Sequence, residues 1–332
     1  MRKKSTLAAI SGRGMTRRSF IGAGLAGVTL LALTACSTDS GDPGVRSSSN
    51  GSGGTSAATS IDTSAFASLL DAGKVADDSL IEANVWAKTV KDRGRLLVGG
   101  VETSTLFSQR DDTDGKLYGF DAGLTQLLAR YVLGDQTKFE LTKVTSDTRE
   151  SVLQNNQVDC VFATYSINDA RKQLISFAGP YYSSHQGILV TKDNASVGGL
   201  NDLAGKSVAV QSGSTGPGIL AQYCPDAKQQ EFTTSAEAEE ALSQGRVDAY
   251  VIDRTMLEST VAKQPDDFKV VGEPFGPDDQ YGIGMPLDSD GVAFVNAFLK
   301  EVENDGLWER LWKICIGDRT NQTTAPQPPA LA

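Results

Sequence analysis

A short pattern occurs twice in this chain, and it constrains the fold more than any other feature. Residues 153–159 lead into the apolar stretch 160–164, and residues 242–248 lead into the apolar stretch 249–252. Each copy has the pattern of a helix end, a turn, the dipeptide Val-Asp and a buried strand. Two copies about ninety residues apart suggest two similar lobes.

Strand and helix patterns alternate around the first copy. Residues 95–101 and 138–144 are expected to form strands, and Asp121 is expected to cap a helix that ends at Gly134. A further helix is expected over residues 79–94. One face of that helix would carry Leu80, Ala83, Ala87 and Val90. Alternating elements of this length predict an α/β sheet with helices on both faces.

Two segments are fit to cross between the lobes. Residues 186–192 and 280–286 are apolar or mixed strands. The chain would build the first part of lobe I over 77–190, lobe II over 191–281, and the second part of lobe I over 282–318. Two crossing strands make a hinge, and a cleft between lobes is a natural binding site for a small molecule.

The N-terminal segment reads as an export signal. Residues 1–35 carry six basic side chains and no acid, and an uncharged stretch over 19–35 ends in Leu-Thr-Ala before Cys36. Its apolar run is too short to predict a membrane span. Arg17-Arg18 resembles the twin-arginine signal, and the end resembles a lipobox whose Cys36 receives a diacylglycerol. Ordinary signal basicity and a chance cysteine remain the alternatives.

The two ends of the mature chain are expected to be loose. Residues 36–76 begin with a tract rich in Ser and Gly, which predicts a flexible tether, and the proline-containing segment 319–332 predicts a loose tail. Removing six of the 31 basic residues leaves 25 against 41 acids, a net charge of −16. An acidic surface argues against nucleic acid and anionic lipid as partners. Membrane attachment would come from the lipid at Cys36.

The chemistry of cofactor and metal sites has little support in this sequence. Cys160, Cys224 and Cys315 leave an odd count, so at least one thiol is expected to be free. There is no Cys-x-x-Cys, and His185 is the only histidine, so a Ser-His-Asp triad or a multi-histidine metal site would have to use it. We therefore predict no cofactor and no metal.

The stretch 158–172 is the first candidate binding segment. Thr164 and Ser166 stand at the end of a strand, and Arg171 follows at the start of a helix. The end of a strand is where open α/β sheets bind ligands. The guanidinium of Arg171 matches a carboxylate in bidentate fashion. Spacing alone also allows Arg171 to be a solvated helix charge.

Lobe II offers two further candidates. The loop 211–216, which contains Ser214, follows a strand and precedes a helix that begins near Pro217. Such a loop presents N–H groups to an anion, although a plain strand–helix turn is the alternative. Asp253 ends the second Val-Asp strand, where an aspartate often only caps the next helix.

Three spaced motifs carry a family resemblance. Gly-Lys-Leu-Tyr-Gly-Phe-Asp at 115–121, Thr-Tyr-Ser-Ile-Asn-Asp-Ala-Arg at 164–171 and Phe-Ala-Gly-Pro-Tyr-Tyr at 177–182 resemble the polar amino-acid-binding proteins of ABC transporters, the family 3 extracellular solute-binding proteins. The similarity runs from about residue 94 to residue 317 and is strongest to actinobacterial glutamate- and glutamine-type binding lipoproteins. It implies a two-lobe, periplasmic-binding-protein-like fold of type II with two crossing hinge strands.

The resemblance assigns roles to the candidate residues. It implies that Arg171 grips the α-carboxylate of the ligand, that Ser166 assists, that Asp253 receives the α-ammonium, and that the loop of Ser214 closes over the ligand. The physics agrees, because a zwitterion needs a cation and an anion on opposing walls. The other expected ligand-binding residues are Thr164, Thr215, Tyr165, Ser104, Phe107 and Arg149.

The expected side-chain pocket departs from the family pattern. Relatives that bind glutamine or basic residues usually carry aromatics near positions 104 and 146, but this chain has Ser104 and Ser146. Relatives specific for acidic ligands can carry an arginine near position 101, where this chain has Val101. Arg149 is a candidate for a second carboxylate, or it braces the lobe. We expect glutamate or aspartate as the ligand, with glutamine and asparagine close behind.

These inferences predict a monomeric, lipid-anchored binding protein on the extracytoplasmic face of the cell membrane. Its cleft would close on an amino acid, and the closed form would dock on an ABC permease. A sensory lipoprotein that reports to a membrane receptor would use the same site. An enzyme of the dehydratase type is the less favoured reading, because no acid–base pair stands out beyond the ligand-binding residues.

Overall fold

The computed structural model describes residues 60–331. The expected signal segment, Cys36 and most of the expected tether lie outside the described residues. Within residues 60–331, none of the helices combines the length and the apolar character that crossing a membrane requires.

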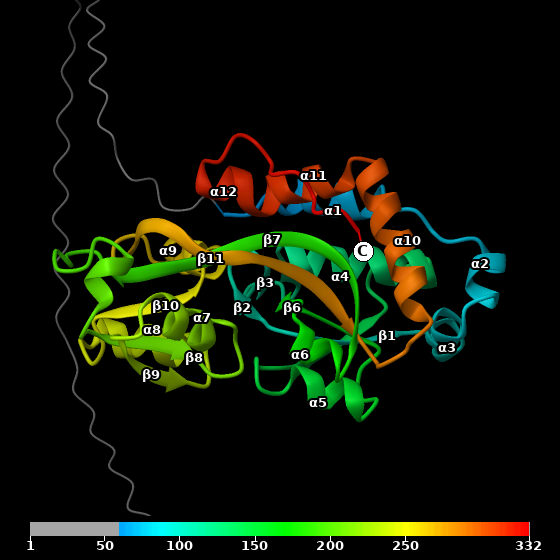
Figure 1. Cartoon of the computed structure of the whole chain (residues 1–332). Helices are drawn as coiled ribbons and strands as arrows, with labels where there is room; N and C mark the ends of the chain where they lie inside the picture. The colour runs from blue at the N-terminus through cyan, green and yellow to red at the C-terminus, as the bar shows by residue number, and fades with distance from the viewer. Residues whose placement is uncertain (1–59, 332) are drawn as a thin grey trace, which may run out of the picture. The chain divides into compact units, whose positions relative to one another are not determined.

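One mixed sheet of eight strands runs through both lobes (Figure 1). The strands follow in the order β5-β1-β6-β11-β7-β10-β8-β9 across the sheet. The strands of lobe I are β1 (Leu96–Gly100), β5 (Phe139–Lys143) and β6 (Cys160–Ser166). Those of lobe II are β8 (Ser207–Gln211), β9 (Lys228–Phe232) and β10 (Ala249–Asp253). Neighbouring strands within each set of three are parallel.

Two long antiparallel strands join the lobes, β7 (Ser176–Thr191) and β11 (Phe268–Met285). They pair with each other from Phe268↔Thr191 to Met285↔Ser176. At the lobe I end β11 pairs with β6, and at the lobe II end β7 pairs with β10. Figure 1 shows both strands passing from one group of elements to the other. The predicted two-lobe α/β fold with two crossing strands is confirmed.

The repeated Val-Asp pattern has the same structural role in both lobes. Asp159 precedes β6, and its carboxylate accepts a 2.7 Å hydrogen bond from the backbone N–H of Leu97 at the start of β1. Asp248 precedes β10, and its carboxylate accepts a 2.8 Å hydrogen bond from the N–H of Ser207 at the start of β8. Each aspartate therefore fixes the register between its own strand and the parallel neighbour.

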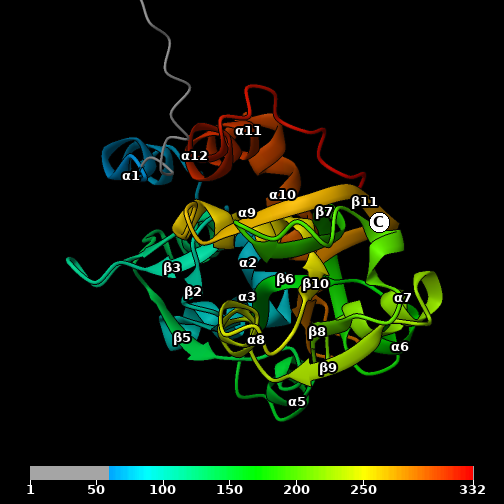
Figure 2. The ribbon, with the colours of Figure 1, turned by 90° about the vertical axis from the view of Figure 1, so that its left-hand side faces the viewer.

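Helices cover both faces of the sheet in each lobe, as Figure 2 shows for lobe II. Lobe I carries α2 (Asp78–Glu82), α3 (Val85–Arg93), α4 (Phe120–Leu133), α5 (Arg149–Gln154), α6 (Asp169–Lys172), α10 (Gly291–Asn304), α11 (Leu307–Trp312) and the π-helical turn η2 (Lys313–Gly317). Lobe II carries η1 (Leu200–Leu203), α7 (Gly216–Tyr223), α8 (Ser235–Ser243) and α9 (Arg254–Lys263). Lobe I also holds a small antiparallel sheet of β2 (Thr103–Ser104), β3 (Ser108–Arg110) and β4 (Leu117–Tyr118).

The helix expected over residues 79–94 is two helices, α2 and α3, and its expected face is only half right. Leu80 and Ala83 are exposed, whereas Ala87 and Val90 are buried. The break occurs at Asn84, whose side chain accepts a hydrogen bond from the N–H of Ala87. Asp290, far along the chain, accepts hydrogen bonds from the first N–H groups of α3. These caps start a new helix where local periodicity predicted a continuous one.

Both ends of the folded part are more ordered than the sequence predicted. Helix α1 (Thr63–Asp71) lies within the expected tether and buries Phe66, Leu69 and Leu70 against lobe I. The expected loose tail begins in the short helix α12 (Asp318–Thr320) and continues without regular structure. In that tail Ala325 and Leu331 are partly buried against the same core. Scattered apolar side chains in polar surroundings thus anchor both segments.

Candidate functional site

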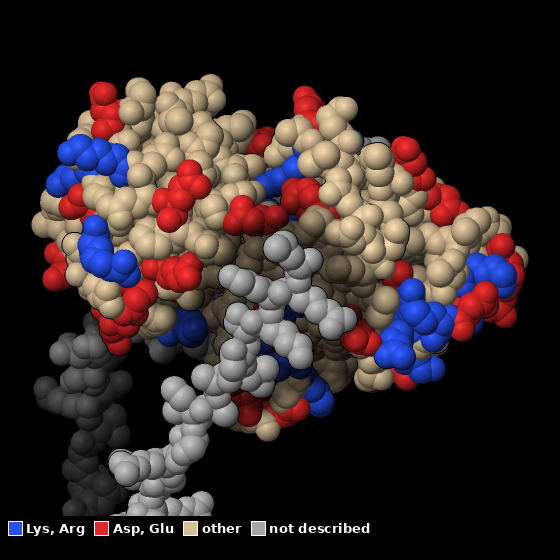
Figure 3. Space-filling model, turned by 90° about the horizontal axis from the view of Figure 1, so that it is seen from below, with Lys and Arg blue, Asp and Glu red and all other residues tan. Residues whose placement is uncertain are grey.

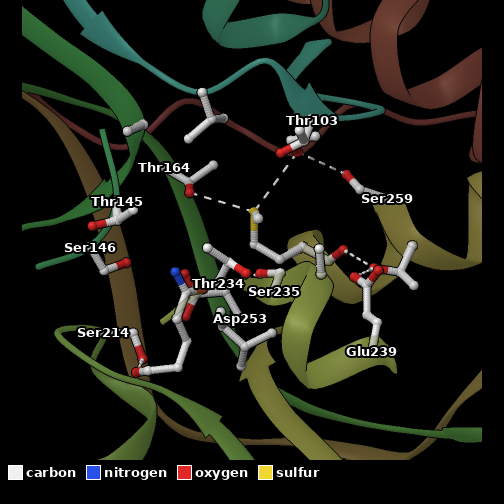
Figure 4. Close-up of a pocket in the computed structure, with 18 of the residues that line it drawn as sticks. Thr103, Thr145, Ser146, Thr164, Ser214, Thr234, Ser235, Glu239, Asp253 and Ser259 are labelled. Atoms are coloured by element: carbon white, nitrogen blue, oxygen red, sulfur yellow. Dashed lines mark hydrogen bonds between the residues drawn. The ribbon is translucent and has the colours of Figure 1, made fainter. Parts of the chain in front are cut away.

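A cavity of about 290 Å³ lies between the two lobes (Figure 4). Its wall is dominated by hydroxyl groups, those of Thr103, Ser104, Thr105, Thr145, Ser146, Thr164, Ser166, Ser214, Thr234, Ser235, Ser259 and Thr260. The ionisable residues in the wall are Arg149, Glu239, Asp253 and Lys263. The volume suits one small polar molecule rather than a polymer or an extended cofactor.

The two lobes touch each other around this cavity. On one side, Ser212 of lobe II donates a 2.5 Å hydrogen bond to the carboxylate of Asp147 in lobe I. On the other side, the hydroxyl of Ser259 in α9 accepts a 3.3 Å hydrogen bond from the N–H of Leu106 and lies 3.4 Å from the hydroxyl of Ser104. The structure therefore shows the cleft closed, with bonds between the lobes at both of its sides.

Arg149 supplies the positive charge of the lobe I wall. Its side chain is buried, and Nη1 donates a 3.0 Å hydrogen bond to the carbonyl of Ala163. Its buried Nε has no hydrogen-bond partner among residues 60–331. Burial, together with the nearby Arg171, lowers the pKa of Arg149 to about 10, so it remains a cation at neutral pH. A cationic side chain in the cavity wall that has hydrogen-bonding capacity to spare suits an anionic ligand group.

Arg171 lies next to this wall but does not line the cavity in the closed structure. Its Nη1 donates a 2.7 Å hydrogen bond to the carbonyl of Ser166, and Nη2 donates a 2.8 Å hydrogen bond to the carbonyl of Gly213 in lobe II. Its Nε lies 3.5 Å from a carboxylate oxygen of Glu150. Arg171 is buried, so it is not the solvated helix charge that its spacing also allowed. Of the expected carboxylate cradle, Ser166 reaches the cavity and Arg171 lies directly behind it.

Tyr165 connects the two arginines. The guanidinium carbon of Arg149 lies 4.1 Å from the centre of its ring, and that of Arg171 lies 5.1 Å from it. The ring packs edge-on against Phe177 in β7, with 5.0 Å between centroids. Tyr165 was expected among the ligand-binding residues, but it is a platform beneath the cationic wall rather than part of the cavity lining.

Asp253 forms the facing acidic wall in lobe II. It ends β10 and is buried, and its carboxylate accepts hydrogen bonds from Gln186 Nε2 at 2.6 Å and from the hydroxyl of Tyr281 at 2.9 Å. It makes no side-chain cap to α9, which begins at the next residue. Burial, and then the charge of Asp279, raises the pKa of Asp253. A cationic group in the cavity would favour the ionised form of Asp253.

The Gly-containing loop before α7 places Ser214 on the cavity wall. The Ser214 hydroxyl donates a 2.7 Å hydrogen bond to the carbonyl of Gln211 and accepts one of 3.2 Å from the N–H of Gly216. Thr215 was expected at the site but does not line the cavity. Its hydroxyl donates to Asp279 at 2.9 Å and accepts from Gln186 at 3.3 Å, which ties this loop to the hinge strands.

Phe107 is the clearest misplacement among the expected ligand-binding residues. Its ring is fully buried and packs edge-on against Phe120, Tyr182 and Tyr281 in the lobe I core. It therefore belongs to the core rather than to the cavity. Ser104 and Thr164, by contrast, line the cavity as expected.

Several lining residues were not anticipated, among them Met256 and Glu239. The sulfur of Met256, in α9, accepts a 3.5 Å hydrogen bond from the hydroxyl of Thr164 and lies 3.9 Å from that of Ser104, so it fills the middle of the cavity from the lobe II side. Glu239, in α8, accepts a 2.6 Å hydrogen bond from the hydroxyl of Thr260. Glu239 stands among other glutamates on an amphipathic helix, and only the position of the helix at the cleft distinguishes it from them.

Charged groups of both signs surround the site without forming a metal centre. Among residues 60–331 there is no group of three or more His, Cys, Asp or Glu that could hold a metal ion. Cys160, Cys224 and Cys315 are free and buried.

Figure 3 shows basic and acidic side chains interspersed over one face, with a hollow where the two lobes meet.

Comparison with known proteins places the chain in a family. Residues 96–317 match the model for bacterial extracellular solute-binding proteins, family 3. The ABC transporter glutamine-binding protein of Bacillus subtilis is 31% identical over 225 residues, which cover 68% of this chain and 82% of the relative. The glutamate-binding protein of Corynebacterium glutamicum is 34% identical over 235 residues, covering 66% and 79%.

Solved structures agree with this assignment. An ancestral arginine-binding protein bound to arginine is 34% identical, with a TM-score of 0.62, and the match covers 68% of this chain and 99% of that protein. The residues matched by the family model, 96–317, contain the eight-stranded sheet and both hinge strands. The chain belongs to the bacterial extracellular solute-binding proteins of family 3.

Proposed function

We propose that this protein binds a polar α-amino acid in the cleft and delivers it to an ABC permease. One observation carries the proposal: Arg149, whose buried Nε has no hydrogen-bond partner within residues 60–331, and Asp253 line the same closed cavity from opposite lobes. An α-amino acid carries the complementary pair of charges on adjacent groups. The named binding functions of the relatives support the same ligand class.

The lobe I wall would hold the α-carboxylate. Arg149, Ser166 and Thr164 face the cavity there. Arg171 would complete the wall by exchanging its hydrogen bond to the Gly213 carbonyl for one to the ligand. Each of these donors would replace a water of the carboxylate, which is necessary because a charge that loses its water without a partner is strongly disfavoured.

The lobe II wall would hold the α-ammonium. Asp253 lines the cavity and accepts hydrogen bonds from Gln186 and Tyr281, which fix its orientation and leave further acceptor capacity on the carboxylate. Because one charged group of the ligand is held by each lobe, only the closed cleft satisfies both. The ligand therefore favours closure, and the closed form is the one that we propose docks on the permease.

The ligand would come from the group of glutamate, aspartate, glutamine and asparagine. The sequence favours the two acidic members, and the hydroxyl-rich wall is compatible with all four. An acyl anchor at Cys36 would keep the protein at the extracytoplasmic face of the cell membrane, where a permease is accessible. A sensory role would use the same cleft and differ only in the partner of the closed form.

A thermal-shift screen of the twenty amino acids tests the proposal. A ligand present at a hundred times its dissociation constant adds about 2.7 kcal/mol to the free energy of unfolding, which is readily seen as a higher melting temperature. We expect members of the four-ligand group to raise it. No stabilisation by any amino acid would contradict the proposal. Uptake of the radiolabelled ligand by a deletion strain separates transport from sensing, and NMR of the incubated ligand detects any enzymatic product.

A further inference from the structure

The far end of the cavity carries a second acid that the amino and carboxyl groups of the ligand do not need. Glu239 lies on α8 at the opposite side of the cavity from Ser146 and Ser214 (Figure 4). It is half-buried. The residues that would bind the α-groups, Arg149 and Asp253, belong to α5 and to the end of β10. Glu239 lines the same cavity as these two residues, so it is available to contact the side chain of an amino acid that they hold.

The hydrogen bonding of Glu239 leaves it able to accept from a ligand. One carboxylate oxygen accepts the hydroxyl hydrogen of Thr260, in α9, at 2.6 Å. Within residues 60–331 no donor reaches the other oxygen. None of the arginines or lysines described lies within ion-pair distance of it either, so the carboxylate is held in place by a neutral hydroxyl. It thus presents acceptor capacity and negative charge to the cavity.

Lys263 lies at the same end, one turn beyond Thr260 on α9, and it lines the cavity with an exposed side chain. An ammonium group donates hydrogen bonds only, and an ionised carboxylate accepts them only. A carboxamide has both an N–H₂ donor and a C=O acceptor, so it complements this pair. A carboxylate side chain on the ligand would place a second negative charge beside Glu239. A cationic side chain would be repelled by the ammonium group of Lys263.

Resting on the function proposed above, we infer that Glu239 and Lys263 form a side-chain subsite that selects an amino acid with a carboxamide side chain over its acid counterpart. This reverses the preference for glutamate and aspartate that the sequence analysis favoured. The reason is that positions 101, 104 and 146 carry no charged side chain, whereas α8, which no local pattern places at the cleft, brings Glu239 into the cavity wall. Glu239 would determine specificity for the side chain of the ligand and would not hold the α-groups.

Calorimetric titration with two matched ligand pairs tests the inference. Glutamine and glutamate form one pair, and asparagine and aspartate form the other; in each pair the amide and the acid have nearly the same shape. At pH 8, well above the ordinary carboxyl pKa, we expect the parent protein to bind the amide of the better-binding pair at least tenfold more tightly than the acid.

The substitution Glu239→Gln should remove this preference. It keeps the shape and the acceptor for Thr260 but removes the negative charge, so the amide-to-acid affinity ratio should fall at least tenfold. Glu240→Gln, an exposed neighbour outside the cavity on the same helix, should leave the ratio unchanged. Glu239→Ala serves as a second variant should the amide side chain perturb folding, and it should also lower the ratio.

The possible outcomes separate this inference from the proposed function. Equal or tighter binding of the acid by the parent protein overturns the inference alone, as does an unchanged ratio in both Glu239 variants. If none of the four ligands binds, the inference is overturned, and so is the proposal that the ligand is glutamate, aspartate, glutamine or asparagine.

Discussion

Nη2 of Arg171 in lobe I donates a 2.8 Å hydrogen bond to the carbonyl oxygen of Gly213 in lobe II. The next residue back in the same loop, Ser212, bonds to Asp147, so this loop contacts two separate segments of lobe I. Because these bonds exist only when the cleft is closed, they bias the equilibrium between open and closed forms in addition to any bias from a ligand.

The close approach at Gly213 leads to the first prediction. A Cβ atom at Gly213 would lie 2.4 Å from a carboxylate oxygen of Asp147 and 2.8 Å from the backbone of Asp147 and Ser146. Gly213→Ala should therefore oppose closure. We expect ligand affinity to fall about tenfold to a hundredfold, which corresponds to about 1.4–2.8 kcal/mol, as measured by calorimetry.

The backbone strain of that substitution needs its own control. Gly213 has a φ of +68°, where a side chain is strained in any surroundings. Gly245 has a φ of +67° and no atom within 4 Å of its ideal Cβ position. Gly245→Ala should thus lower the melting temperature through the same backbone strain, but it should leave ligand affinity unchanged. Equal affinities in the two variants would show that the contact does not govern closure.

The cationic wall leads to the second prediction. Arg171→Ala removes a proposed carboxylate donor, one of the bonds between the lobes, and the cation 3.5 Å from Glu150. Titration calorimetry should show a loss of several kcal/mol of binding free energy, on the order of that for breaking a buried charge pair. Lys172→Ala changes an exposed neighbouring cation and should leave binding unaffected. If Arg171→Ala bound the ligand as tightly as the parent protein, Arg171 would have no part in ligand binding.

The environment of Asp253 leads to the third prediction. Since burial and the charge of Asp279 raise the pKa of Asp253, this group keeps its proton at pH values where an ordinary carboxyl group is already ionised. Binding of an ammonium group favours the ionised form, so it should release protons, and affinity should weaken as the pH falls through the raised pKa. Calorimetry in buffers of different ionisation enthalpy measures this release. Asp253→Asn should abolish it, and a release that persists in the variant would assign the proton to another group.

A buried acid in lobe I leads to the fourth prediction. Asp121 was expected to cap α4, but it lies inside that helix and accepts hydrogen bonds from the N–H of Thr164 and the hydroxyl of Tyr181, at 2.9 and 2.8 Å. Burial raises its pKa to about 7. Asp121 thus ties the end of β6, which carries the cavity residues, to β7.

The sign of the pH effect follows from this raised pKa. The folded protein binds more protons at Asp121 than the unfolded chain does between pH 3.8 and about 7, so its contribution lowers the free energy of unfolding as pH rises through that window. Asp121→Asn should remove this contribution. The change in the free energy of unfolding across the window should then be smaller by at most about 4 kcal/mol, since one pKa unit corresponds to about 1.4 kcal/mol. Denaturant titrations of parent and variant from pH 4 to 8 provide the comparison, and identical slopes would contradict the assignment.

The two-lobe architecture was predictable because it follows from patterns within short stretches. The Val-Asp pattern precedes β6 and β10, and the apolar strands that cross between lobes are recognisable from composition. The break between α2 and α3 was not predictable, because the carboxylate that caps α3 belongs to Asp290, about two hundred residues away in sequence. The order of α1 was missed for a similar reason, since its apolar face is stabilised only by lobe I.

The site was predictable in its polar chemistry but not in its geometry. Ser104, Thr164, Ser166 and Asp253 reach the cavity as expected. Whether an arginine faces the cavity or lies one layer behind depends on the side chains around it, and in the closed form the carbonyl of Gly213 takes up a donor of Arg171. The role of Glu239 depends on where lobe II comes to rest against lobe I, which no local pattern encodes.

A crystal structure of the protein with a bound amino acid would show which side chains hold the two charged groups of the ligand. We expect its carboxylate to lie within hydrogen-bond distance of Arg149 or Arg171 and its ammonium nitrogen to lie within about 3.2 Å of the Asp253 carboxylate. A ligand seated away from these side chains, or held by one lobe alone, would contradict this expectation.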